Sequence, residues 1–409
     1  MRHRAAGLMR AGEMWAGRGR AGLVRACLVA VGLAAVGPVL GVPVSAGALA
    51  APREFNAWPA PAARQAVKVT TVVDGLDHPW SVAFLPDGRL LVTERTGRLR
   101  TVQEGRLLPE PVAGLPPIEE VGQGGLLEVA LHPDHARNRL VYISYAEPDP
   151  SGRGHRTAIA RFRDGNGTAE GFEVLYRGTS DRTRHHFGSR IVFGTDGKLY
   201  FSIGDRGTDK RAQDPADSSG SILRLNDDGS IPGDNPFVGR PGHLPELYSM
   251  GNRNPQGLAV QPGTGLIWES EHGPQGGDEI NIIRAGANYG WPVITYGRTY
   301  GLGLPIGEGT EKPGMVQPEL YFVPSLALAG MTFYTGDALP AWKGDLIVAL
   351  LGGGLVRLDV EDDRVVAAER LLEEELGRTR HVAQGPDGAL YALVDEPAPG
   401  GRLVRIDPQ

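Results

Sequence analysis

A histidine and an aspartate near the ends of two predicted strands have the residue types of a general base and its partner. His186 precedes one strand and Asp205 ends the next, within Arg184–Gly207. Adjacent antiparallel strands would bring both side chains to the same rim. A histidine that donates one ring proton to a carboxylate is oriented and made more basic. The alternative is a surface histidine and a turn aspartate, and spacing does not separate His186 from His185.

Three further polar residues have the chemistry to bind an anionic ligand. Arg253 and Asn254 precede Pro255, which favours an extended or turn conformation. A fixed guanidinium beside an amide suits an anionic or quinone oxygen. Gln123 is flanked by glycines, which let backbone approach a ligand closely. On its own, Gln123 is equally well explained as a turn amide.

Another segment, Ser270–Pro292, contains the carboxylate residues Asp278 and Glu279 beside several glycines. Carboxylates and exposed carbonyls together can form an oxygen-only Ca²⁺ site. The spacing differs from that of the EF-hand loop, so the pattern indicates calcium only weakly.

The elements that must position these residues are short strands that recur along the chain. Each unit is a turn followed by alternating apolar residues, because Asp-Gly accepts a tight turn and β-branched and aromatic residues suit a pleated strand. The copies are PDGRLLVTE (86–94), HPDHARNRLVYISYAE (132–147), TDGKLYFSIGD (195–205), TGLIWESEHG (264–273), GDLIVALLGGGLVRLD (344–359) and PDGALYALVDE (386–396).

Six copies over residues 66–409 leave roughly 57 residues for each, close to the size of a four-stranded propeller blade with its loops. The sequence therefore predicts an all-β fold, a six-bladed β-propeller of four-stranded antiparallel blades. Residues 68–73 would pair with the last blade and close the ring, which removes an exposed edge. The alternative is one β-sandwich or two in tandem.

Composition excludes several classes of protein. Of 409 residues, 41% are apolar and 22% charged, so the chain can bury a core. Its 59 glycines and 32 prolines follow no collagen period and indicate many turns. The net charge is −6, and six arginines against one glutamate in the first 50 residues leave −11 for the remainder. This acidity argues against nucleic acid or an anionic membrane as a partner.

The N-terminus has the three parts of an export signal. Arginines precede the uncharged run Ala26–Leu40, and Ala48-Leu49-Ala50 supplies a cleavage site. A membrane anchor is the alternative, although prolines interrupt the apolar stretch. We expect residues 1–50 to be removed together with the only cysteine, Cys27. Residues 51–65 are predicted to be an Ala/Pro-rich exposed linker, and residues 66–409 the propeller domain.

The motifs together resemble the glucose/sorbosone dehydrogenase family, the soluble aldose dehydrogenases that use pyrroloquinoline quinone. The resemblance covers essentially the whole mature chain, from DHPWSVAFLPDGRLLVTER (77–95) to RTRHVAQGPDG (378–388). Its most specific pieces are GQGGLL, the block from the histidine to GDRG, GNRNPQGLA and EHGPQGGDEIN with NYGWP. It implies a six-bladed propeller.

The resemblance also implies a role for each matching residue. His186 matches the catalytic base, Asp205 the carboxylate that orients it, and Arg253 the cation that polarises the quinone oxygen. The positions that match quinone contacts are Gln123, Arg253, Asn254, Tyr300, Arg378 and Arg380. The carbonyls of Gly273 and Pro274 match ligands of the cofactor's Ca²⁺, and Glu279 with the backbone of Tyr289 matches a separate structural Ca²⁺ site.

The implied activity is oxidation of an aldose at its anomeric carbon to a lactone, with an external acceptor reoxidising the quinone. The implied setting is periplasmic or extracellular, as a monomer or homodimer without stable membrane insertion after signal removal. Two positions depart from the family pattern. Leu351 stands where relatives place a lysine against the quinone, which weakens the expected affinity, and Lys210 replaces a glutamine and is expected to compensate in part.

Two other functions remain open from the sequence. A non-catalytic extracellular ligand-binding propeller is consistent with Leu351 as a mark of lost quinone binding. A calcium-dependent hydrolase of the lactonase type is a weaker possibility, because such enzymes also use propellers. The sequence does not specify the sugar or the electron acceptor.

Overall fold

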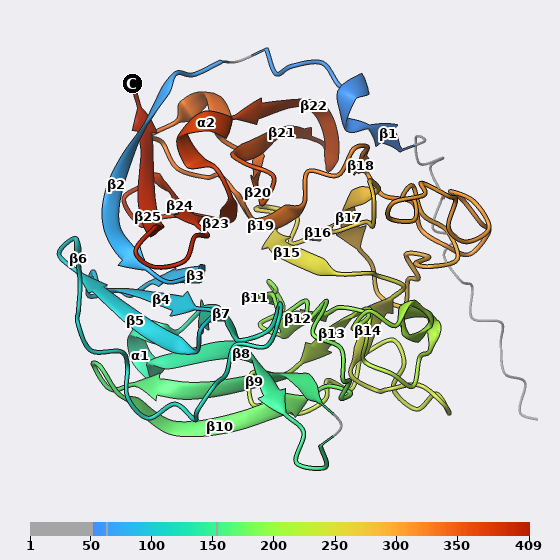
Figure 1. Cartoon of the computed structure of the whole chain (residues 1–409), viewed down its shortest axis with the longest axis horizontal. Coiled ribbons are helices and arrows are strands. Elements are labelled where there is room, and N and C mark those ends of the chain that lie inside the picture. Colours follow the sequence, from blue (N-terminus) through green and yellow to red (C-terminus); the bar gives the residue numbers. More distant parts are fainter. Residues whose placement is uncertain (1–51, 63, 153) are drawn as a thin grey trace, which may run out of the picture. The chain divides into compact units, whose positions relative to one another are not determined.

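The computed structural model describes residues 52–62, 64–152 and 154–409. These residues form six β-sheets around a central axis, each with four antiparallel strands, and one sheet gains a fifth (Figure 1). The six-bladed propeller prediction is therefore confirmed. The predicted export signal lies outside the described residues.

The sheets are built from neighbouring segments of the chain. The first contains β3 (Pro79–Phe84), β4 (Leu90–Glu94), β5 (Arg98–Gln103) and β6 (Arg106–Leu107). The second contains β7 (Leu126–Leu131), β8 (Leu140–Pro148), β9 (His155–Asp164) and β10 (Ala169–Arg177). The third contains β11 (Ile191–Phe193), β12 (Leu199–Ile203), β13 (Ser221–Leu225) and β14 (Leu247–Met250).

The remaining sheets follow the same plan. The fourth contains β15 (Pro255–Val260), β16 (Ile267–Glu271), β17 (Asp278–Ile283) and β18 (Leu320–Phe322). The fifth contains β19 (Leu328–Phe333), β20 (Leu346–Leu350), β21 (Leu355–Glu361) and β22 (Arg364–Leu371). The sixth contains β23 (Thr379–Gln384), β24 (Leu390–Val394), β25 (Gly401–Pro408) and, from the other end of the chain, β2 (Val67–Leu76).

The ring closes between β2 and β25. The two strands are antiparallel, with Lys68 opposite Asp407 and Val73 opposite Leu403. The predicted closure through residues 68–73 is confirmed, and it joins segments more than 300 residues apart.

The six recurring sequence units mark the second strand of each sheet in turn, β4, β8, β12, β16, β20 and β24. The predicted Asp-Gly turns precede three of them, and Gly88, Gly197 and Gly388 all have positive φ angles of 71–90°. Such angles favour glycine because it lacks a Cβ. The first strand of each sheet lies nearest the axis (Figure 1). The first and second strands are antiparallel neighbours, so the start of the first strand and the end of the second lie at the same central rim.

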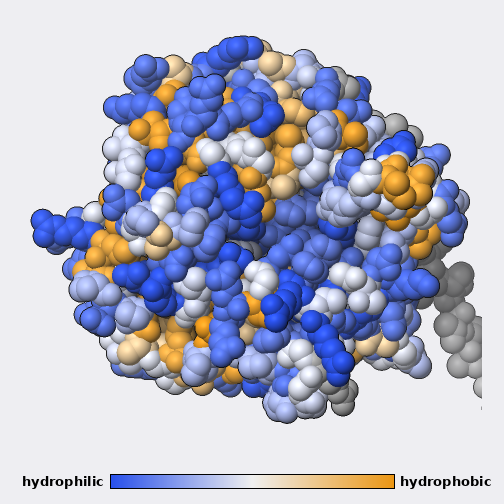
Figure 2. Space-filling view, viewed as in Figure 1, coloured by the Kyte–Doolittle hydropathy of each residue, from blue (hydrophilic) through white to orange (hydrophobic). Residues whose placement is uncertain are grey.

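Apolar side chains fill the space between neighbouring sheets. Leu91 and Leu99 of the first sheet belong to one buried cluster with Ile143 and Phe162 of the second. On the face shown in Figure 2, hydrophilic residues surround the hollow at the centre of the ring. The short helices lie in connections: α1 (His135–Asn138), α2 (Glu373–Leu376) and the 3₁₀ turns η1 (Phe55–Ala57), η2 (Asp209–Gln213) and η3 (Pro340–Trp342).

Part of the predicted linker packs against the propeller. β1 (Arg53–Glu54) pairs in parallel with β18 and adds the fifth strand to the fourth sheet. Phe55 stacks on Phe322 with ring centroids 4.9 Å apart, and Trp58 is partly buried against the same apolar cluster. Four residues, two paired and two aromatic, thus hold a segment that its Ala/Pro content alone marks as exposed.

Candidate active site

One rim of the ring collects most of the predicted site residues. Because neighbouring strands are antiparallel, the residues before a first strand lie beside those after a second strand. Gln123, His186, Asn254 and Arg378 precede first strands, whereas Asp205, His272 and Leu351 follow second strands.

His186 and Asp205 form a direct contact at this rim. His186 Nδ1 lies 2.6 Å from Asp205 Oδ1, and the two side chains are 13% and 2% exposed. A short contact to an ionised carboxylate fixes the Nδ1–H tautomer, with Nδ1 donating to Asp205. The other ring nitrogen, Nε2, has no hydrogen-bond partner among the described residues, so it is left to act as a base.

The backbone of His186 is held in an unusual conformation. Its φ is 51°, in the left-handed region that side chains other than glycine seldom adopt. The backbone N–H of His186 donates to Gln123 Oε1 at 2.8 Å, which anchors this conformation. Backbone strain of this kind is concentrated at functional sites. Gln123 therefore positions the histidine in addition to facing the cavity described below.

The surroundings set the charge state of the pair. Burial lowers the pKa of His186 and outweighs the hydrogen bond to Asp205, and nearby Arg253 lowers it further. Burial opposes ionisation of Asp205, but the contacts with His186, Gly207 and Arg253 together lower the pKa of Asp205. The pair is therefore a neutral imidazole on an ionised carboxylate at neutral pH, as a general base requires.

Arg253 lies beside this pair and is fixed at both ends. Its Nη1 donates to the carbonyls of His272 and Gly273, each at 2.9 Å. Its backbone carbonyl accepts from Asp205 N at 2.8 Å, and its backbone N–H donates to Glu271 Oε2 at 2.5 Å. No hydrogen bond involves Nη2 within the described part of the chain. The Nη2 atom of Arg253 is thus available for a ligand.

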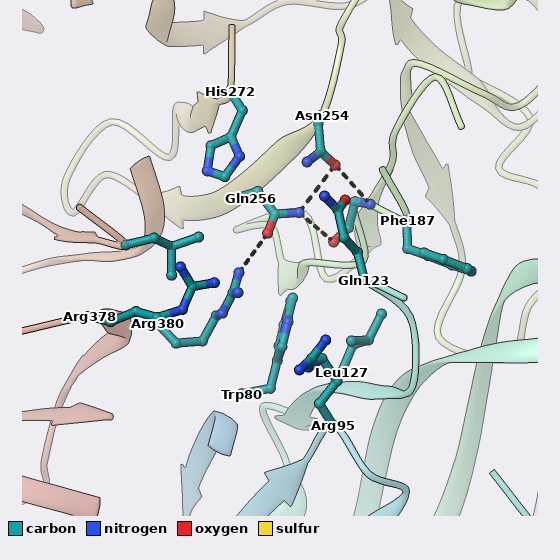
Figure 3. Close-up of a pocket in the computed structure, with 12 residues that line it drawn as sticks. Trp80, Arg95, Gln123, Leu127, Phe187, Asn254, Gln256, His272, Arg378 and Arg380 are labelled. Carbon is teal, nitrogen blue, oxygen red and sulfur yellow. Dashed lines mark hydrogen bonds between the residues drawn. The ribbon is translucent and has the colours of Figure 1, made fainter. Parts of the chain in front are cut away.

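A cavity of about 90 Å³ opens next to the pair (Figure 3). Of the predicted contacts, Gln123, Asn254, Arg378 and Arg380 line it. The other lining residues are Trp80, Arg95, Leu127, Phe187, Gly188, Gln256, His272 and Leu351. Three guanidinium groups in one small cavity favour an anionic ligand.

Gln256 connects the two sides of this cavity (Figure 3). Its Oε1 accepts from Arg380 Nη1 at 3.0 Å, and its Nε2 donates to Asn254 Oδ1 and to the Gly188 carbonyl, both at 3.2 Å. Arg380 is also paired with Asp395, with nitrogen and oxygen 3.0 Å apart. The amide and the guanidinium are therefore held in place before any ligand binds.

The two departures from the family pattern have different outcomes. Leu351 does line the cavity, so an apolar side chain stands at that wall. Lys210 is exposed on η2 and lies outside the cavity lining, which argues against the compensation expected of it. Arg95, which the sequence analysis did not single out, supplies a cation instead; Glu120 and the Gly122 carbonyl hold its guanidinium.

The structure does not bring Tyr300 to this cavity. Its side chain is 67% exposed, in a loop with exposed Leu302 and Leu304. The assignment of Tyr300 as a cofactor contact therefore stays a prediction.

The predicted metal-binding residues lie around a second, very small cavity of about 10 Å³. Gly273, Glu279 and Tyr289 line it, together with Arg253 and Glu271, among others. The Gly273 carbonyl already accepts a hydrogen bond from Arg253. Pro274 follows directly in the chain and packs near Gly297. His272 borders both cavities, so the two sites are adjacent.

Three carboxylates gather beside this second cavity on one face of the fourth sheet. Glu269 lies opposite Asn281 and Glu271 opposite Glu279 in the β16–β17 pairing, and all four side chains are buried. Burial and mutual repulsion raise the pKa of Glu269 and Glu279, and burial raises that of Glu271 to about 7. An oxygen of Glu269, Asn252 and Asn281 is buried without a hydrogen-bond partner.

Such a cluster has the chemistry of a cation site. Ca²⁺ takes six to eight oxygen ligands, and a buried acidic group is stabilised by a counter-charge. In the described residues, no three acidic or histidine side chains converge closely enough to hold a metal by themselves. Amide and backbone oxygens would have to complete the site.

Besides Arg95, the side chains at the site that the sequence analysis did not name include Trp80, Gln256, His272 and Trp291. His272 is neutral, since burial lowers its pKa to about 3, and its Nε2 is buried without a partner. Trp80 stacks with Arg190 Cζ 3.9 Å from its ring centroid. These residues lie within the motifs DHPW, NPQG, EHGP and NYGWP, which could have marked them as candidates. The spacing within a motif does not predict whether a side chain points into the site.

The sequence matches the family model for glucose/sorbosone dehydrogenase over residues 76–405. The aldose sugar dehydrogenase YliI of Escherichia coli is 41% identical over 357 residues, covering 86% of this chain and 95% of that protein.

Two solved structures extend the likeness to the fold. The soluble aldose sugar dehydrogenase from Escherichia coli, in its apo form, superposes with a TM-score of 0.80 at 40% identity, covering 84% of this chain and 100% of that one. The PQQ-bound aldose sugar dehydrogenase from Streptomyces coelicolor gives 0.71 at 30% identity, covering 86% and 100%. With its six-bladed propeller and this rim of buried polar residues, the chain belongs to the glucose/sorbosone dehydrogenase family.

Proposed function

We propose that this protein is an exported quinoprotein that oxidises the anomeric carbon of aldose sugars to lactones, with pyrroloquinoline quinone and Ca²⁺ as cofactors. The observation that carries the proposal is the 2.6 Å contact between His186 and Asp205 beside a cavity lined by three arginines. A base next to an anion-binding cavity is the arrangement that such an oxidation needs.

The cavity fits the chemistry of the quinone, a planar anion with several carbonyl and carboxylate oxygens. Arg95, Arg378 and Arg380 would pair with its negative charge, and Gln123 and Asn254 would contact its polar edge. The unpartnered Nε2 of His272 supplies one more polar atom at this wall. Tyr300 would join this set only if its exposed loop moved toward the cavity.

The catalytic work of the chain falls to three residues. When bound, the quinone supplies the acceptor for the hydride that leaves the anomeric carbon. His186 Nε2 takes the proton of the anomeric hydroxyl, and Asp205 stabilises the imidazolium that results. Arg253, which lines the adjacent smaller cavity and has Nη2 free, stabilises the negative charge that develops on its side of the site. The sugar leaves as its lactone, and an external electron acceptor receives the two electrons.

Calcium is assigned to two places in this proposal. The carbonyls of Gly273 and Pro274 would contact the ion that accompanies the quinone, and because a carbonyl oxygen has two lone pairs, Gly273 would keep its hydrogen bond from Arg253 Nη1. Glu279 and the Tyr289 backbone would hold a structural ion near Glu269 and Glu271, where unpartnered oxygens support a cation.

Reconstitution is the direct test of the function. Purified protein is titrated with pyrroloquinoline quinone in the presence of Ca²⁺, then assayed with a panel of aldoses and an artificial electron acceptor. We expect a stoichiometric bound-quinone spectrum and turnover. Absence of both would reject the proposal in favour of a non-catalytic binding propeller, and hydrolysis of lactones without quinone would favour the hydrolase.

Calcium binding at the acidic cluster should appear as thermal stabilisation. A ligand at one hundred times its Kd stabilises the folded state by about 2.7 kcal/mol, so Ca²⁺ added to chelator-treated protein should raise Tm. Glu279→Gln should abolish most of that rise, whereas Glu361→Gln, at an exposed position at the end of β21, should keep it. Equal calcium-induced shifts in the two variants would remove Glu279 from the site.

Export and the choice of partners belong to the same proposal. The basic, apolar and small-residue order of the first 50 residues supports a periplasmic or extracellular location. None of the helices in the described ranges has the length and apolar character to span a bilayer. We propose an aldose and an external acceptor as partners, with the protein a monomer or homodimer.

A further inference from the structure

The Asp205 carboxylate accepts three hydrogen bonds, and one of them comes from a side chain that the proposed reaction does not use. Asp205 Oδ1 accepts hydrogen bonds from His186 Nδ1 at 2.6 Å and from Gly207 N at 2.7 Å. Asp205 Oδ2 accepts a hydrogen bond from the indole Nε1–H of Trp291 at 2.8 Å. Asp205 is 1% exposed, so water cannot readily replace the indole. Trp291 is therefore the described partner that satisfies the second carboxylate oxygen.

Trp291 is itself fixed within the fold. Its side chain is 8% exposed, and its backbone N–H donates to the Gly251 carbonyl at 2.8 Å. Its own carbonyl accepts from Gln213 Nε2 at 2.7 Å. Hydrogen bonds thus fix the Trp291 backbone at both its N–H and its carbonyl. The buried indole therefore keeps one position and can orient the Asp205 carboxylate.

The same indole lies against Arg253. Arg253 Cζ is 5.4 Å from the Trp291 ring centroid, a distance at which a cation and an aromatic face attract. The Arg253 carbonyl also accepts from Asp205 N. One aromatic side chain therefore contacts the carboxylate behind the base and the cation beside it, although 38 or more residues separate Trp291 from either in sequence.

We propose that Trp291 is a positioning residue, which locks the Asp205 carboxylate so that His186 Nε2 faces the sugar and keeps Arg253 beside it. This inference rests on the proposed function for its catalytic consequence, but its geometric part concerns the protein alone. Loss of the indole N–H leaves Asp205 Oδ2 unpaired in a buried place, and the carboxylate is then free to rotate about its contact with His186.

The charge of the pair should respond as well. Besides Asp205, the titratable or charged groups that face His186 are Arg253, His185 and the neutral His272, and Arg206 also faces Asp205. The indole N–H withdraws negative charge from Asp205. Without it the carboxylate holds the imidazolium proton more strongly, so the pKa of His186 should rise.

The test compares Trp291→Phe with Trp268→Phe in the full-length protein. Trp268 is a matched control, since it is fully buried and its Nε1 donates to Gln261 Oε1 at 2.9 Å in the body of the fourth sheet. Imidazole ¹⁵N NMR with histidine-selective labelling, without quinone, reports the His186 pKa and tautomer. We expect a higher pKa and a more mobile tautomer only in Trp291→Phe.

The reconstituted enzymes give the second readout. Trp291→Phe should lower kcat by on the order of 10²-fold with little change in KM, the size expected when a base is misplaced, and Trp268→Phe should not. An unchanged His186 pKa in Trp291→Phe, or equal changes in both variants, overturns the inference. If the wild-type protein lacks activity, the proposed function fails while the NMR comparison still decides the geometric part.

A measurement on the wild-type protein covers the case in which Trp291→Phe does not fold. The indole ¹⁵N–¹H signal of Trp291 should move at the pH at which His186 titrates, because Asp205 links the two rings. An indole signal that stays constant through that titration overturns the inference.

Discussion

Replacing His186 with alanine should lower kcat by about 10²–10⁴-fold, the usual contribution of a general base. The physical reason is that Nε2 of this ring is the free end of a pair whose other nitrogen is held 2.6 Å from Asp205. The measurement is steady-state oxidation of an aldose by the reconstituted enzyme, with quinone binding followed by absorbance to show that the site is loaded.

His185→Ala is the matched control for this substitution. His185 is the adjacent residue, it is exposed, and its ring centroid lies 6.2 Å from that of His186. It has no described hydrogen bond to a carboxylate, so its removal should leave kcat near the wild-type value. A large loss in His185→Ala with little loss in His186→Ala would transfer the role of base to the neighbour.

Arg253→Ala should lower kcat by about 10²–10³-fold, the loss seen when a preorganised group that stabilises developing charge is removed. Two carbonyls fix Nη1 of this guanidinium and leave Nη2 for a ligand, so the charge needs no rearrangement to act. Single-turnover reduction of the bound quinone by sugar measures the chemical step directly.

Two further variants serve as controls for Arg253→Ala, and the first separates the effect of charge from that of geometry. Arg253→Lys keeps the charge but cannot hold the carbonyls of His272 and Gly273 while reaching a ligand, so it should recover only part of the rate. Arg240→Ala, an exposed arginine outside both cavities, should behave as the wild type. Full activity in Arg253→Ala would show that negative charge in the cavity is stabilised elsewhere.

The fold could be predicted from the sequence because the propeller repeats a short local pattern. The Asp-Gly turn and the alternating strand after it are determined within about ten residues, and all six copies are second strands of a sheet. The segment before the first copy and the insertions between copies lack such a pattern. This is why the pairing of Arg53–Glu54 with β18 and the exposure of Tyr300 were not anticipated.

The candidate site was predictable to the extent that its residues lie in recognisable motifs. His186 and Asp205 do meet, and Gln123, Asn254, Arg378 and Arg380 do line one cavity. The residues behind them were not predictable. Trp291 reaches Asp205 across 86 positions and Arg380 reaches Gln256 across 124, so only the closed ring determines which side chains meet.

The union of β2 with β25 has a consequence for how the protein is made. A contact between positions 68 and 407 cannot form until β25 has left the ribosome, more than 300 residues after β2, and such long-range contacts slow folding. Until then β2 lacks its partner strand, and an unpaired strand edge invites pairing with another chain. Synthesis therefore passes through a stage that is vulnerable to aggregation, and that stage ends when β25 pairs with β2.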